Sequence, residues 1–133
     1  MTNHYDAQQE RGSATPFVLI VAVGLLIMVG LVVDGGGQIN AKDQANGVAQ
    51  SAARAAAVNI SDATGGTPVI DSARAQAAAQ NYIAAAGKTG NVSINGNNVT
   101  VTVTSTYQTI FLSLAGINTL TGSATSTAQI LKQ

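Results

Sequence analysis

The chain has 133 residues, and its six basic and six acidic side chains give a net charge of zero. This length suffices for one membrane-spanning helix and one small domain, and the charge balance points to neither nucleic acid nor an acidic substrate. There is no cysteine, and the single histidine, His4, lies in the N-terminal tail. We therefore predict a protein that is not an enzyme and has no cofactor or metal site.

The stretch from Pro16 to Val33 contains no charged or amide side chain. With residues 13–15 it amounts to roughly 20 residues, enough for a helix to cross the hydrocarbon core of a bilayer. A buried helix and a cleaved secretory signal are the alternatives. However, the run is longer than the apolar part of a signal, and Asp34 follows it instead of a small-residue cleavage site. We predict an uncleaved signal anchor.

The predicted organisation has three parts: a cytoplasmic tail at residues 1–12, a transmembrane helix at 13–33, and an extracytoplasmic α+β domain at 34–133. Flanking charges hardly decide the orientation, because Arg11 on one side faces only Lys42 on the other. The long segment after the helix is rich in Asn, Thr and Ser, which suits an extracytoplasmic surface. We expect a single-pass protein of the cell membrane with its domain at the cell surface.

Three glycines, residues 35–37, follow the predicted span and indicate either a hinge or a helix that continues through them. From Gln38 to Ala56 small apolar residues recur at three- and four-residue steps. This period predicts an Ala-rich helix, whose narrow face packs either on its own domain or on neighbouring subunits. The candidate residues for packing between subunits are Gly24, Gly30, Asp34, Ala45 and Ala52.

A second helix is predicted after a loop at residues 59–68, which contains a Thr-Gly-Gly-Thr sequence. Asp71 or Ser72 can cap its N-terminus, because a short polar side chain can accept a hydrogen bond from a free backbone amide there. The helix should end near Ala86, since Gly87 follows as a C-terminal stop signal.

The period then changes from about 3.6 to 2 at Val92, and Asn95–Asn98 predicts the turn of a β-hairpin. A third strand is expected over about Tyr107–Leu112 and a fourth over about Leu120–Ile130, which gives a small antiparallel sheet of about four strands. The stretch Ile110–Ile117 is the most apolar part of the chain outside the predicted span. It is either the core of the hairpin or an exposed patch that contacts lipid or a partner.

Three segments form a recognisable pattern: Arg11–Ser13 with the apolar run after it, Gly30–Gly36, and the end of the Ala-rich helix at Gln50–Ala57. Together they resemble the TadE/TadG-like family of tight-adherence (Flp-type) pilus systems, in particular its short actinobacterial members. The similar region covers about residues 12–57, and a weaker similarity returns at residues 111–117. The resemblance implies a helix that continues through the glycines.

The resemblance also implies a function: a structural or assembly component of a tight-adherence pilus, acting as a pseudopilin-like or accessory membrane-anchored subunit. The expected partners are membrane lipid, other pilus-assembly or pilin-like subunits and further copies of the chain, with no nucleic acid. Some family members are cleaved by a prepilin peptidase after a glycine that is followed by a glutamate about five residues later. Gly12 matches that glycine and Ser13 would become the new N-terminus, but Pro16 or Phe17 stands where the glutamate is expected.

A membrane-anchored surface binding module without a role in a pilus is the alternative function. Such a module would need a concave site for a ligand such as a glycan or peptide. The sequence offers no aromatic cluster for one, since Tyr82, Tyr107 and Phe111 are the only aromatic residues beyond the predicted span.

Overall fold

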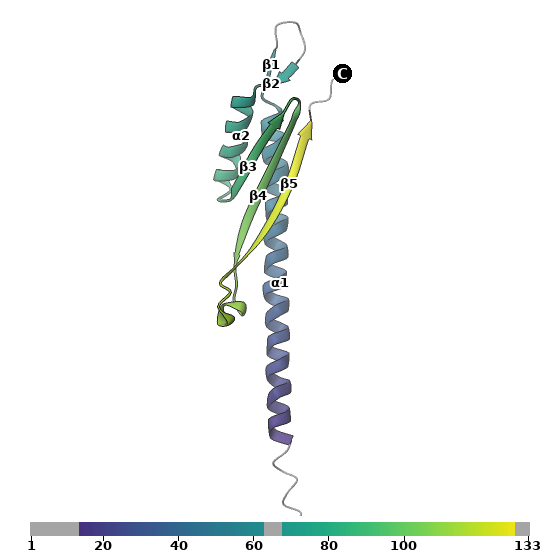
Figure 1. The fold of residues 1–133 in the computed structure, drawn as a ribbon, viewed down its shortest axis with the longest axis vertical. Helices are drawn as coiled ribbons and strands as arrows, with labels where there is room; N and C mark the ends of the chain where they lie inside the picture. The colour runs from purple at the N-terminus through teal and green to yellow at the C-terminus, as the bar shows by residue number, and fades with distance from the viewer. Residues whose placement is uncertain (1–13, 63–67, 130–133) are drawn as a thin grey trace, which may run out of the picture.

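A computed structural model of the chain describes residues 14–62 and 68–129. One long helix, α1 (Ala14–Ala57), carries an α+β head on its C-terminal half, and its N-terminal half projects beyond the head as a single rod (Figure 1). The other elements, in chain order, are β1 (Ile60–Asp62), β2 (Pro68–Ile70), α2 (Ser72–Ala85), β3 (Thr89–Asn95), β4 (Asn98–Gln108), the 3-10 helix η1 (Leu112–Ala115) and β5 (Thr119–Gln129).

Helix α1 continues without a break through the three glycines at 35–37. Its 44 residues correspond to a length of about 66 Å at 1.5 Å per residue. The expectation of a continuous helix is therefore confirmed, and the hinge interpretation is wrong. Among the described residues, α1 is the one helix that is long and apolar enough to cross a membrane.

The C-terminal half of α1 buries a face of small residues against α2, β4 and β5. These side chains are short, so the sheet can approach the helix axis closely. A Cβ atom added to Gly122 of β5, for example, would overlap the backbone of Lys42. The Ala-rich face thus packs on its own domain. Its buried residues are Ala41, Ala45, Ala49, Ala52, Ala53 and Ala56.

The main sheet is antiparallel in the order β3-β4-β5. One face carries the buried side chains of Val99, Val101 and Val103, which form the core with the helices. The other face carries threonines, and the hydroxyls of Thr100 and Thr102 pair with those of Thr127 and Thr125 on β5 at 3.0 and 2.9 Å. This alternation and the turn between β3 and β4 confirm the predicted hairpin.

Two predictions about strands are wrong. The main sheet has three strands, because the alternation of β4 runs on to Gln108 and the expected separate strand at Tyr107–Leu112 does not form. The backbone leaves the sheet after Gln108, since the amides at 110–112 bond to a side chain of α1 instead of to a neighbouring strand. Within the predicted loop at 59–68, β1 and β2 pair as a two-stranded ribbon, and residues 63–67 lie outside the described part.

Helix α2 confirms the predicted capping. The side chain of Asp71 accepts a hydrogen bond from the backbone amide of Arg74 at 3.1 Å, and the helix ends with Ala86 at its C-cap. Gly87 follows with a positive φ of 65°, which a residue with a side chain rarely adopts. The caps thus set the bounds of α2, which packs against α1 and β3 and contributes Ala75, Ala79 and Ile83 to the core.

Candidate functional site

Asp34 lies on α1 immediately after the apolar segment, and its exposed fraction is 0%. Its carboxylate accepts three backbone hydrogen bonds from the chain between β4 and η1: from Ile110 at 2.8 Å, from Phe111 at 2.9 Å and from Leu112 at 2.6 Å. The hydroxyl of Tyr107 donates a fourth hydrogen bond at 3.4 Å. One buried side chain therefore ties the far end of the sheet to the long helix.

The surroundings of Asp34 favour its ionised form. Burial is the largest single influence, and it raises the pKa of Asp34. The hydrogen bonds from the amides of Ile110, Leu112 and Phe111 and from the hydroxyl of Tyr107 lower the pKa, and together they outweigh burial. The pKa of Asp34 therefore lies below its ordinary value of 3.8. The pKa of Tyr107 is raised above 10.0 by burial, by the charge of Asp34 and by the hydrogen bond between them. At neutral pH the site holds a carboxylate facing a neutral phenol.

Two glycines on the same face of α1 allow the loop to come this close. Gly30 lies one turn before Asp34, and a Cβ atom added there would stand 2.8 Å from the Cβ atom of Phe111. Gly37 lies one turn after it, and an added Cβ atom would overlap the ring of Tyr107. We use the name Asp34 clasp for Asp34, Gly30, Gly37 and Tyr107 together with the backbone of residues 110–112.

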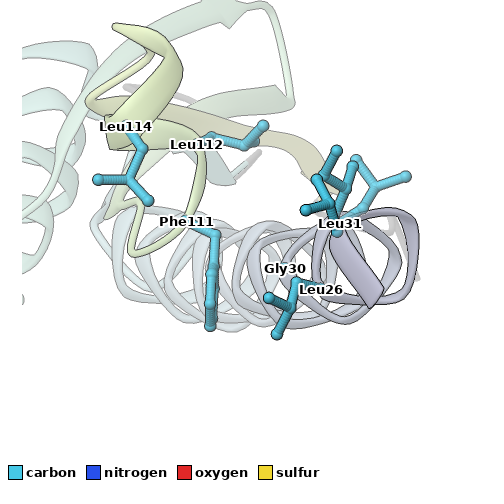
Figure 2. A pocket seen from close by; sticks show the side chains of 8 residues that line it. Leu26, Gly30, Leu31, Phe111, Leu112 and Leu114 are labelled. Atoms are coloured by element: carbon cyan, nitrogen blue, oxygen red, sulfur yellow. The ribbon is translucent and has the colours of Figure 1, made fainter. Parts of the chain in front are cut away.

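An apolar groove of about 200 Å³ lies on the N-terminal side of the clasp, between α1 and η1. Figure 2 shows Phe111, Leu112 and Leu114 on the η1 side and Leu26 and Leu31 on the helix side. Leu114 is 88% exposed, and its neighbours in the sequence are also exposed or half-buried. The stretch 110–117 is thus an exposed patch, and its interpretation as the core of the hairpin is wrong.

The predicted packing residues are not all in one environment. Gly30, Asp34, Ala45 and Ala52 are buried within the chain itself, by the clasp and by the head. Gly24 lies on the part of α1 that projects from the head, with nothing within 4 Å of an added Cβ atom. Contact of any of the five with another subunit stays a prediction. The predicted processing residues, Gly12 and Ser13, lie outside the described residues.

The sequence singles out Asp34 but not its hydrogen-bond partners, and it gives Gly37 and Tyr107 no role at this site: Gly37 was a possible hinge residue and Tyr107 the start of a strand. The available signal was a lone acid at the end of an apolar run, with glycines four residues before and three residues after it on one helix face. The Asp34 carboxylate already accepts hydrogen bonds from three backbone amides and one hydroxyl of the chain itself. In the ranges 14–62 and 68–129, no group of three or more His, Asp or Glu side chains could hold a metal ion.

The fold and the clasp define a stem-and-head protein, in which a long helix with a bare apolar half is fastened to a small α+β head. Residues 12–59, which include all of α1, match the model of the Tad family, described as "Putative Flp pilus-assembly TadE/G-like". This match confirms the TadE/TadG-like resemblance and relates the chain to Flp pilus assembly. No curated protein and no solved structure matches the chain.

Proposed function

We propose that the protein is a structural or assembly component of a tight-adherence (Flp-type) pilus, acting as a pseudopilin-like or accessory membrane-anchored subunit. One observation carries the proposal. The family match falls on α1, and the N-terminal half of that helix is apolar on all sides and meets the head only at the clasp and at the groove beside η1 (Figure 1). A helix with no polar face needs an apolar environment around its whole circumference.

The bare half of α1, residues 17–33, suits both a bilayer and an assembly. Its large side chains are exposed around the helix, from Phe17 to Val32. In lipid such a surface is well solvated, and exchanging lipid contacts for contacts with another apolar helix is decided by packing, not by hydrophobicity. The same surface can therefore anchor the subunit in the membrane and later pack against other stems.

The proposed topology places residues 1–12 in the cytoplasm, 13–33 across the membrane and the domain from Asp34 outside. Because the chain has no cysteine, a single introduced cysteine reports on the side of the membrane at its own position. A membrane-impermeant maleimide added to intact cells should label Asn81→Cys, on the exposed side of α2, and should leave Thr2→Cys unlabelled. The reverse pattern would contradict the orientation, and labelling of neither site would contradict a surface location for the head.

Partners of the stem provide the test of the pilus role. A photo-crosslinking amino acid at Ile20, which is exposed on the bare half of α1 and away from the groove, should form covalent adducts with other pilus-assembly components in the native membrane. The same amino acid at Val58, which is exposed just beyond the C-terminal end of α1, serves as the matched control. Adducts with lipid alone at Ile20, together with capture of a surface glycan or peptide by the head, would support the alternative of a binding module.

A further inference from the structure

We propose that the connection Ile110–Ile117 is a second membrane-embedded segment, which enters the extracytoplasmic leaflet beside α1, and that a lipid acyl chain occupies the groove between them. The inference rests on the membrane anchor proposed above. It extends that anchor from a single helix to a helix plus a short loop of the head.

The depth of the loop follows from its contacts with α1. Phe111 packs against Gly30, and the groove extends along the helix to Val23. At 1.5 Å per residue, these two positions lie about 6 Å and about 16 Å on the N-terminal side of Asp34. Both are inside the proposed span of residues 13–33. A loop held at this level beside a spanning helix lies below the membrane surface.

The side chains of the loop fit that location. No charged residue occurs between Lys88 and Lys132 in the sequence. Leu114 projects almost fully exposed, and Ile110 is 60% exposed, an arrangement that is unfavourable in water and favourable among acyl chains. The groove is lined by apolar side chains and Gly30, with no side-chain hydrogen-bonding group to favour a polar ligand.

Polar backbone groups in a bilayer need partners within the protein, and this requirement excludes most irregular segments. Six of the eight amides of residues 110–117 have such a partner. The Asp34 carboxylate accepts the amides of residues 110–112, and it is itself removed from solvent. In the turns that follow, backbone amides donate to the loop's own carbonyls: Leu114 to Phe111, Gly116 to Ser113 and Ile117 to Leu112. The Ser113 hydroxyl donates to the carbonyl of Ile110.

The occupant follows from the walls of the groove. One wall is the apolar half of α1, so the groove is continuous with the helix surface that faces acyl chains in the proposed anchor. Figure 2 shows Leu26 and Leu31 on this wall with Leu114 on the loop side. An acyl chain is flexible, narrow and apolar, and it is present at this depth wherever the anchor is inserted.

Tryptophan fluorescence tests the proposal, because the chain has no tryptophan of its own. The full chain would carry one reporter at a time: Leu114→Trp in the loop, Leu19→Trp in the bare half of α1, and Val58→Trp at the far end of α1. All three side chains are exposed, so the larger ring meets no core packing. Ile117→Trp provides a second loop reporter if L114W alters the far-UV spectrum.

Each variant is reconstituted at a high lipid-to-protein ratio into phosphatidylcholine vesicles with either ordinary or brominated acyl chains. We expect bromine to quench L114W and L19W severalfold more than V58W. If bromine quenches L19W but not L114W, the loop is not embedded, although the anchor is. If bromine quenches neither variant, the anchor is overturned as well. A blue-shifted but unquenched L114W would mean that a second copy covers the loop, and equal quenching of V58W would mean that the whole head lies in lipid. Either result also overturns the proposal.

Discussion

The contact between Gly37 and Tyr107 provides a sharp test of how the head is fastened to the stem. Gly36 and Gly37 are adjacent residues of the same helix, and both lie beyond the apolar segment. An added Cβ atom meets nothing within 4 Å at Gly36, whereas at Gly37 it overlaps the Tyr107 ring. Gly36→Ala and Gly37→Ala therefore change the helix propensity equally and differ in packing alone.

The expected difference in stability follows from helix propensity and from packing. Gly→Ala in a helix interior stabilises the folded state by roughly 0.5–1 kcal/mol, which is the full expected effect at Gly36. Overpacking typically costs about 1–3 kcal/mol, so the two variants should differ by about that amount, with G37A the less stable. For a domain of this size, each kcal/mol corresponds to about 4–8 °C in Tm.

Thermal unfolding of the full chain in detergent micelles, followed by far-UV circular dichroism, measures this difference. The double variant with Tyr107→Ala is the control, because removing the ring removes the overlap. In the Y107A background, G37A should no longer be less stable than G36A. Equal Tm values for G36A and G37A in the otherwise unchanged chain would refute the close approach of Tyr107 to the helix.

Four further predictions concern the clasp and the hairpin turn. Asp34→Asn should lower the Tm more than the exposed control Asp43→Asn, because it removes the charge that accepts three amides, as thermal unfolding would show. The folded-state pKa of Asp34 is lowered, so its stabilisation is fully present above the unfolded value near 3.8 and is lost as the pH falls below it. The Tm of the unaltered chain should then fall more steeply with acid than that of D34N, and parallel curves would contradict this. Gly30→Ala should be less stable than the matched control Gly24→Ala by about 1–3 kcal/mol in bilayer nanodiscs, and equal unfolding temperatures would argue against the clasp. Gly96→Ala should cost about 1–2 kcal/mol, because its φ of 57° requires the left-handed region, and an unchanged Tm would contradict that turn.

Local sequence signals predicted most of the helices and the hairpin. The apolar run, the Ala period and the Asp71 cap each act within a few residues, and the structure confirms the elements that they indicate. The hairpin was predictable for the same reason, since alternation of valine and threonine on either side of the Asn95–Asn98 turn is a local pattern.

The remaining features depend on contacts between distant parts of the chain. The amides of residues 110–112 bond to Asp34, which lies 76 or more positions away, and no local pattern shows that these amides have found an acceptor outside the sheet. For this reason the segment was expected to be a strand. The glycines at 35–37 likewise suggested a hinge, because the one feature that requires Gly37, the ring of Tyr107, is contributed by β4.

The proposed role of this stem-and-head protein is to contribute to a tight-adherence pilus. The most direct test counts surface pili by electron microscopy in cells that lack the protein, and in the same cells supplied with the unaltered chain. We predict that pili are lost or sharply reduced without the protein and return with the unaltered chain. Pili of unchanged number and length in its absence would contradict the claim.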